Sequence, residues 1–154
     1  MSLFDEKLIF LDYESKNKKD ILKNLSKELE NMGYVDSYKN FSKAVLEREK
    51  HSTTGIGFNI AIPHGKSSSV HEPFVVLAKP KKSLEWESLD DEPVDMIFLI
   101  GVPEKSADEH LKILQKLSVN LMDEKFRENL KNAESKEEIL NLVKNIEWFI
   151  CLKI

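Results

Sequence analysis

The stretch Val94-Asp-Met-Ile-Phe-Leu-Ile-Gly-Val102 decides the fold class. Its apolar residues run on without the alternation of a strand that has one face in water, so it predicts a strand covered on both faces. Phe74–Ala78 is a second run of this kind, and Leu8–Tyr13 and Ile60–Ile62 are shorter ones. Together the four segments predict a buried sheet.

Amphipathic helices are predicted between and after these strands. Apolar residues recur at helical spacing over Asp20–Met32 and over about residues 37–49. Beyond the last strand, two Ser-x-x-Glu capping boxes predict helices that begin at Ala107 and just after Ser135, with a short helix over Phe126–Lys131 between them. Strands interleaved with helices indicate the α/β class, with one sheet covered by helices on both faces.

Length and composition exclude several classes of protein. The chain has 154 residues, of which 41% are hydrophobic and 32% charged, as in one globular domain. Its 23 basic and 27 acidic side chains leave a net charge of −4, which argues against nucleic-acid binding. No apolar run is long enough to span a membrane, and the acidic start does not resemble a signal peptide, so we expect a cytoplasmic protein. The one cysteine, Cys151, excludes an internal disulfide and is expected to be a small packing residue.

His64 is the most informative of the four histidines. It follows the predicted strand Ile60–Ile62 and Pro63, and it precedes Gly65. Proline fixes its own φ angle and glycine permits turns that other residues resist, so we expect stiff backbone to hold the ring at the edge of the sheet while the chain turns away at Gly65. Sites concentrate in loops at strand ends. The spacing alone leaves open a surface histidine without a function.

His110 and Arg48 are the two other candidates. His110 falls in the first turn of a predicted helix, where the helix dipole and burial both favour a neutral ring and where backbone N–H groups can bind an anion. A helical histidine that only packs is the alternative. Arg48 falls near the end of the predicted helix over residues 37–49, where its guanidinium either meets the C-terminal carbonyls or reaches an anion near His64.

Other features favour no site. His51 and His71 lie in polar sequence and are expected to be solvated, and Glu85–Glu92 is expected to be an exposed acidic connection. The pair Gly55-Ile-Gly57 lacks the third glycine and the following helix of a dinucleotide-binding fingerprint. A metal-dependent hydrolase built on the two candidate histidines would need a third ligand, and the sequence has no H-E-x-x-H motif.

Four segments resemble the fructose/mannitol type of enzyme IIA domains in the bacterial phosphoenolpyruvate-dependent sugar phosphotransferase system. The most specific combination is A-I-P-H-G around His64 with a downstream His-Leu helix at His110. One departure is Asn59, where family members often carry glycine or a polar residue; asparagine tolerates left-handed backbone, so the loop can form. The matching segments cover the chain from about residue 4 to 143 and are Leu46–Glu49, Thr54–Lys66, Pro93–Pro103 and Asp108–Ser118.

The resemblance implies a phosphocarrier on an α/β sandwich with a mixed sheet. His64 would accept a phosphoryl group from the phosphohistidine of the carrier protein HPr and pass it to a cysteine of an enzyme IIB domain. His110 would contact the phosphoryl oxygens, and Arg48 would be the active-site arginine. Neither a metal nor a cofactor is required. A regulatory enzyme IIA of the nitrogen type, whose phosphorylation state controls partner binding, is the alternative.

The resemblance also implies one domain over residues 1–154, with a core of about residues 4–145 and an apolar tail over residues 146–154. The tail has no counterpart in the family pattern, and it either packs on the body or contacts a partner. In such systems the sugar is selected by the membrane permease, so the sequence of this chain indicates neither the sugar nor the oligomeric state, and recruitment to a permease stays open.

Overall fold

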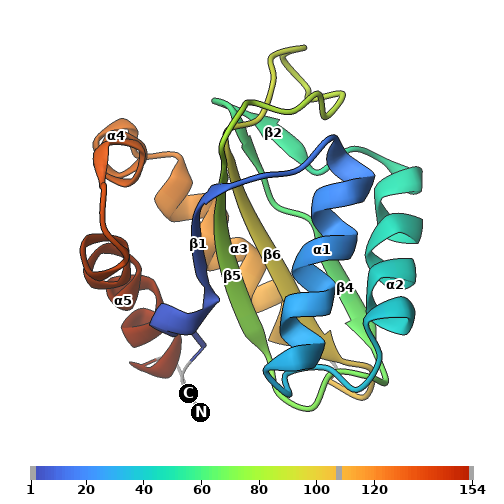
Figure 1. The fold of residues 1–154 in the computed structure, drawn as a ribbon. Coiled ribbons are helices and arrows are strands. Elements are labelled where there is room, and N and C mark those ends of the chain that lie inside the picture. Colours follow the sequence, from blue (N-terminus) through green and yellow to red (C-terminus); the bar gives the residue numbers. More distant parts are fainter. Residues whose placement is uncertain (1–2, 107–108, 153–154) are drawn as a thin grey trace.

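A mixed six-stranded sheet lies between two layers of helices (Figure 1). The computed structural model describes residues 3–106 and 109–152, with the backbone alone at 109–110 and 145–152. Helices α1 and α2 cover one face, and α3, α4 and α5 cover the other. The elements are a 3-10 turn at Glu6–Leu8, β1 (Ile9–Tyr13), α1 (Lys18–Asn31), α2 (Tyr38–His51), β2 (Gly55–Gly57), β3 (Ile60–Ala61), β4 (His64–Ser67), β5 (Phe74–Pro80), β6 (Met96–Pro103), α3 (Glu109–Leu121), α4 (Glu124–Asn132) and α5 (Lys136–Leu152).

The strand order is β1-β5-β6-β3-β2, with β4 paired to β6 beyond β3. The pairs β1–β5, β3–β6 and β4–β6 are parallel, whereas β5–β6 and β2–β3 are antiparallel. The α/β class and the mixed sheet are therefore confirmed. Both of the long apolar runs form central strands, and every described residue of β6 except Pro103 is buried, as expected for strands covered on both faces.

Side chains from the two faces of the sheet form two separate cores. On one side, the predicted stripes of α1 and α2 pack on the sheet, and on the other side α3, α4 and α5 do so. The largest fully buried side chain, Trp86, belongs to the α1–α2 side. The carboxylates of the acidic connection over residues 85–92 are exposed, as predicted, but the buried indole of Trp86 anchors this segment to the core.

The chain does not turn away at Gly65, so that expectation was wrong. Residues 64–67 continue as strand β4 along β6. A Cβ atom at Gly65 would lie 2.7 Å from Cγ2 of Val45, so this glycine is needed for the close approach of α2 to the strand. The left-handed backbone occurs earlier, at Phe58 (φ 60°) and Asn59 (φ 64°), which form the tight turn between β2 and β3.

Most helix limits follow their predicted signals. Asn17 and Ser37 cap α1 and α2 by accepting N–H groups of the first turn, and the Ser135 hydroxyl accepts the N–H of Glu138, as in the predicted capping box. The predicted helix start at Ala107 lies outside the described residues. Helix α5 continues to Leu152, so the tail extends a helix rather than forming a separate segment; its packing concerns side chains outside those described.

Candidate functional site

His64 is the first residue of β4 and lies in register with Ile100 of β6. Residues in register on adjacent strands project to the same face of a sheet. Ile100 belongs to the core on the α3–α5 side, whereas Gly65, the next residue of β4, meets α2 on the opposite side. The imidazole of His64, which is half-buried, therefore faces the layer that contains α3.

The local backbone determines the tautomer of His64. Its Nδ1 atom lies 3.0 Å from the carbonyl oxygen of Ile62. A carbonyl oxygen only accepts hydrogen bonds, so this contact requires the proton on Nδ1, and Nε2 of the neutral ring then carries the lone pair. The contact spans only two residues across Pro63, whose ring restricts the backbone between them. The arrangement presents one defined nitrogen as a nucleophile.

A chain of hydrogen bonds that the sequence did not reveal holds the Ile62 peptide. The N–H of Ile62 donates to the carbonyl oxygen of Thr54 at 2.9 Å. Thr54 in turn donates its own N–H to the Glu49 carboxylate at 3.0 Å, and its hydroxyl donates to the other oxygen of that carboxylate. The Trp86 indole N–H donates to the Thr54 hydroxyl at 3.3 Å. Glu49 thus supports the peptide that orients the His64 ring.

Glu49 is a buried carboxylate, with 8% of the residue exposed. Its cationic neighbour is Lys18, whose Nζ lies 3.5 Å from Oε2. Glutamate is rarely this buried without partners, and the three donors from Lys18 and Thr54 supply them. Because the partners come from α1 and from the segment before β2, no spacing rule within one helix would have identified this residue.

His110 is the second residue of α3, the helix that follows β6 after five connecting residues. Helix α3 packs on the same face of the sheet that His64 occupies, through Ile113, Leu117 and Leu121. The structure therefore brings the start of α3 to the layer that His64 faces. The side chain of His110 lies outside the described ones, so its contact with a phosphoryl group stays a prediction.

Arg48 forms hydrogen bonds at the C-terminal end of its own helix, α2. Its Nη1 donates to the carbonyl oxygen of Ser52 at 2.9 Å and to the Ser52 hydroxyl at 3.4 Å. This is the C-terminal contact that the helix position predicted. Arg48 as a whole is half-buried, but the hydrogen bonds of its guanidinium are exposed, and its approach to an anion at His64 stays a prediction.

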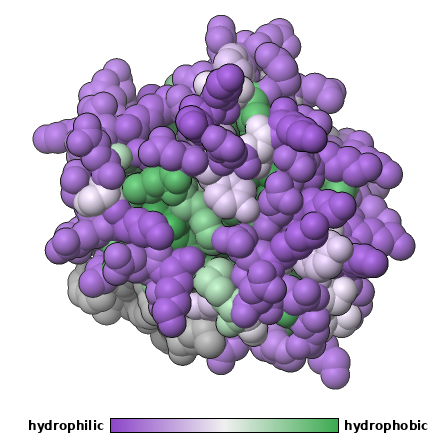
Figure 2. Space-filling view, viewed as in Figure 1, coloured by the Kyte–Doolittle hydropathy of each residue, from purple (hydrophilic) through white to green (hydrophobic). Residues whose placement is uncertain are grey.

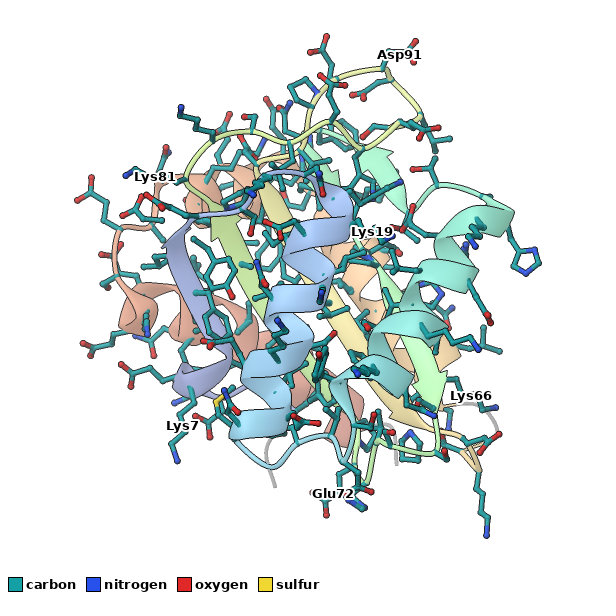
Figure 3. The ribbon with its side chains drawn as sticks, turned by 45° about the vertical axis from the view of Figure 1, so that its right-hand side comes forward. Lys7, Lys19, Lys66, Glu72, Lys81 and Asp91 are labelled. Carbon is teal, nitrogen blue, oxygen red and sulfur yellow. The ribbon has the colours of Figure 1, made fainter. Side chains whose placement is uncertain are left out.

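Lys66 shares a face with His64 because alternate residues of a strand project to the same side. Its side chain is exposed, and within the part of the chain that the structure describes it forms no ion pair. Figure 3 labels it on β4. Lys66 was not among the predicted site residues, because a turn was expected at residue 65; a predicted strand over residues 64–67 would have identified this lysine by alternation.

The remaining histidines lie away from this site. His51 is exposed at the end of α2, as predicted. His71 is also exposed, and its Nε2 lies 2.7 Å from Oδ1 of Asp36. Across residues 3–106, 109–152 and their described side chains, no group of three His, Cys, Asp or Glu could hold a metal ion. In the same residues, no helix is both long and apolar enough to cross a membrane.

Two groups whose pKa values are shifted lie near the β2–β3 turn. Burial raises the pKa of the Asp95 carboxyl, against the opposing effect of Lys131 and Lys79. Burial also lowers the pKa of Lys79, which donates to the carbonyl oxygen of Ala133 at 2.8 Å. Asp95 donates its backbone N–H to Asn59 at 2.9 Å. These charges belong to the packing of the turn against α4, not to the candidate site.

The sequence and the fold are similar to one family. Residues 2–146 match the family model "Phosphoenolpyruvate-dependent sugar phosphotransferase system, EIIA 2". The PTS system fructose-specific EIIABC component of Bacillus subtilis is 36% identical over 141 residues, which are 92% of this chain and 22% of that protein. The chain therefore spans less than a quarter of that relative's length.

Two solved structures share the fold over nearly their whole length. The nitrogen regulatory protein IIA-Ntr from Neisseria meningitidis superimposes with a TM-score of 0.84 at 29% identity, over 92% of this chain and 96% of that one. Enzyme IIAMTL, in its complex with phosphorylated enzyme IIBMTL from Escherichia coli, gives a TM-score of 0.77 at 26% identity, over 93% and 99% of the two chains. With the family model matched over residues 2–146, the chain belongs to the type 2 enzyme IIA family of the phosphoenolpyruvate-dependent sugar phosphotransferase system.

Proposed function

We propose that this protein is a phosphocarrier that accepts a phosphoryl group on Nε2 of His64 from phosphorylated HPr and passes it to an enzyme IIB domain. The observation that carries the proposal is the 3.0 Å contact between Nδ1 of His64 and the Ile62 carbonyl oxygen. It fixes the tautomer that a nucleophilic imidazole needs, on a strand that faces α3.

The proposed transfer neither adds a proton to the His64 ring nor removes one from it. The lone pair of Nε2 attacks phosphorus, and the bond between phosphorus and the donor's histidine nitrogen breaks. The donor ring, which carries a proton on its other nitrogen, keeps that electron pair and leaves as neutral imidazole. The proton on Nδ1 of His64 stays in place. The phosphorylated ring gains positive character, and the Ile62 carbonyl oxygen opposite that N–H stabilises it. Onward transfer to a cysteine thiolate reverses these steps.

Donors near His64 stabilise the phosphoryl group. It brings about −2 charge and three acceptor oxygens. Lys66 is the cation on the same face of β4, and the N–H groups at the start of α3 offer further donors. We include the His110 ring and the Arg48 guanidinium in this set. Phosphoryl transfer depends mainly on positioning and charge stabilisation, and a carrier needs a donor set weak enough to release the group again.

The names of two similar proteins support the proposal that an enzyme IIB domain accepts the phosphoryl group from this chain. Enzyme IIAMTL of Escherichia coli was solved in complex with phosphorylated enzyme IIBMTL. The Bacillus subtilis relative carries EIIA within an EIIABC component. We infer that an enzyme IIB domain is the acceptor for this chain and that a sugar permease is the destination; HPr as donor follows from the resemblance of the A-I-P-H-G motif.

A regulatory role is the second candidate. The observation that favours it is the TM-score of 0.84 to a nitrogen regulatory protein, which exceeds the 0.77 to enzyme IIAMTL. Both roles use the same phosphorylated His64. Addition of the purified IIB and IIC components of a sugar permease separates them, because a transport protein loses its phosphoryl group to sugar in that mixture and a regulator retains it.

Labelling with phosphoenolpyruvate, enzyme I and HPr tests the proposal. We expect one phosphoryl group per chain, labile in acid and stable in base as a phosphoramidate. His64→Ala should take no label, and His110→Ala should take label but transfer it onward poorly. His71→Ala, a matched change at an exposed histidine, should behave as wild type. Label that persists in the His64 variant would exclude the proposed nucleophile.

A further inference from the structure

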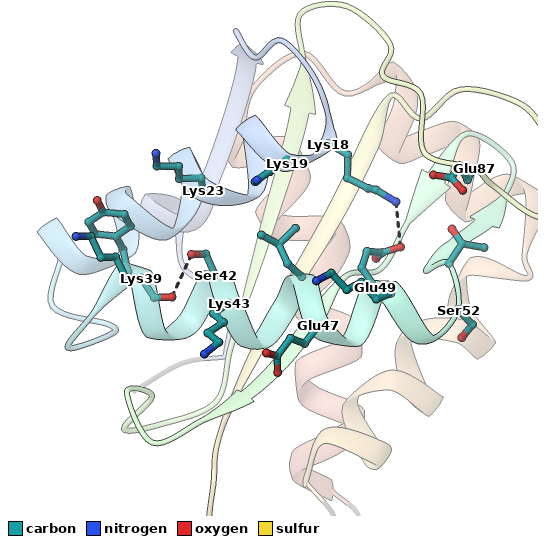
Figure 4. Close-up of a pocket in the computed structure, with 14 residues that line it drawn as sticks. Lys18, Lys19, Lys23, Lys39, Ser42, Lys43, Glu47, Glu49, Ser52 and Glu87 are labelled. Atoms are coloured by element: carbon teal, nitrogen blue, oxygen red, sulfur yellow. Dashed lines mark hydrogen bonds and ion pairs between the residues drawn. The ribbon is translucent and has the colours of Figure 1, made fainter.

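A lysine-lined groove runs between α1 and α2 on the outside of the molecule (Figure 4). Its volume is about 770 Å³. The charged residues in its lining are six lysines and three glutamates, so the groove carries a net charge of +3 in a chain whose net charge is −4. The lysines are Lys18, Lys19, Lys23, Lys39, Lys43 and Lys50.

Most of these ammonium groups lack a counter-charge. Lys18 is paired with Glu49. Among the described residues, the other five have no carboxylate within 4 Å, and all five are exposed. Several cations around one hollow repel one another, which raises the free energy of the unoccupied groove and favours an anionic occupant. Lys18 belongs to the Glu49 network, whereas no hydrogen bond or ion pair between the described side chains of α1 and α2 and no step of the proposed phosphocarrier chemistry uses the other five lysines.

The groove lies on the side of α2 that faces away from β4. Val45 points from α2 to Gly65, whereas His64 faces the α3 layer on the other side of the sheet. Figure 2 shows that the molecular surface over α1 and α2 is mostly hydrophilic. An occupant of this groove would leave the proposed phosphorylation site open.

The shape and chemistry of the groove select one class of anion. Lys39 and Lys50 are about 16 Å apart along the helix axis, the length of about five residues of extended chain. Lysines are point charges without the fork of arginine that binds a phosphate in two places. The Lys27 ammonium lies 5.3 Å from the centroid of the Tyr38 ring, so one face of the aromatic ring in the groove lining already has a cation over it. Half-buried Leu46 gives the groove an apolar contact.

We propose that the α1–α2 groove binds an extended acidic segment of a partner protein, with carboxylates against the lysines and an apolar side chain against Leu46. This proposal does not depend on phosphorylation of His64. The acidic net charge of the chain argues against a nucleic acid in the same place, and the concave, partly apolar form suits a peptide better than a flat bilayer.

An NMR titration tests the groove with a defined probe. The ¹⁵N-labelled full chain is titrated with a synthetic peptide of alternating glutamate and leucine, and with the same peptide carrying lysine for glutamate. We expect saturable shifts confined to amides of α1 and α2 with the acidic peptide only, weakened by added salt. Absence of saturable shifts there, or equal shifts with the basic peptide, overturns the proposal.

Charge-reversal variants give the matched comparison. Lys23→Glu with Lys43→Glu removes one cation from each helix, and both sites are exposed. We expect about tenfold weaker peptide binding, because two attractive pairs become repulsive. Lys82→Glu with Lys125→Glu makes the same change in net charge at exposed sites outside the groove and should change the affinity less than about twofold.

A milder double variant and a titration with a second anionic ligand complete the test. The spectra show whether each variant is folded, and the milder Lys23→Gln with Lys43→Gln should weaken binding in the same direction by less. Inorganic polyphosphate is titrated separately. Binding of polyphosphate in the groove without binding of the acidic peptide would overturn the assignment to a protein segment and identify a phosphate polymer as the ligand class.

Discussion

Replacing Glu49 by alanine should weaken both the fold and the orientation of the His64 ring. The carboxylate accepts the N–H of Thr54 at 3.0 Å and its hydroxyl through the second oxygen, and the residue is 8% exposed. Hydrogen bonds to charged groups contribute about 1.5–3 kcal/mol each, and buried donors left unsatisfied carry their own cost. We expect a loss of about 3 kcal/mol in the free energy of unfolding.

Glu47→Ala is the matched control, since Glu47 lies on the same helix but is exposed. Urea unfolding should show a change below about 0.5 kcal/mol for this variant. The comparison isolates the buried network from the general loss of a helical carboxylate. Equal destabilisation by the two variants would contradict the structural account of Glu49.

The effect on His64 has its own readout. Loss of the Thr54 anchor loosens the Ile62 peptide, whose carbonyl oxygen holds Nδ1 of His64. ¹⁵N chemical shifts of the imidazole report the tautomer. We expect the Nδ1–H form to dominate in wild type and in Glu47→Ala, and to lose population in Glu49→Ala under conditions where that variant is still folded. An unchanged tautomer in the folded variant would refute the proposed route from Glu49 to the ring.

Three further changes test other parts of the account. Gly65→Ala should cost about 1–3 kcal/mol in urea unfolding because its Cβ would lie 2.7 Å from Val45, and Val45→Ala in the same chain should recover part of the loss; full stability of the single variant would be inconsistent with the close approach. Burial raises the pKa of Asp95 above its ordinary value of 3.8, so the folded wild-type protein loses stability as pH rises and this proton leaves. The free energy of unfolding of Asp95→Asn, measured relative to wild type, should therefore increase as pH rises above 3.8; a difference that stays constant between pH 4 and 7 would count against this reasoning. Lys66→Ala should slow phosphorylation roughly threefold, the effect of one exposed charge pair, with Lys66→Arg near wild type, and rates that do not respond would remove this lysine from the site.

The fold class could be predicted because its strongest signals are local. The uninterrupted apolar runs of β5 and β6 are long enough to identify buried strands, and the capping residues of α1, α2 and α5 mark their starts. Asn59 was compatible with left-handed backbone, and its φ of 64° confirms this. These features depend on residues that are close together along the chain, so they can be recognised in a single sequence.

The errors arose where distant contacts decide the local structure. Glycine at position 65 suggested a turn, but the residue is small because Val45 packs against it from α2. Trp86 is buried in a connection whose carboxylates are exposed, because its ring packs in the core on the α1–α2 side and its indole N–H donates to Thr54. The role of Glu49 likewise depends on donors from two other segments. Periodicity carries no information about such pairings, since they are set by how α2 lies on the sheet.

The most direct test of the phosphocarrier assignment is to identify the phosphorylated atom. The ¹⁵N-histidine-labelled protein is phosphorylated with phosphoenolpyruvate, enzyme I and HPr, and the nitrogen coupled to ³¹P is determined by NMR. We predict one coupled nitrogen, Nε2 of His64, with the proton retained on Nδ1 toward Ile62. Coupling to Nδ1, or to a nitrogen of any other histidine, would contradict the account.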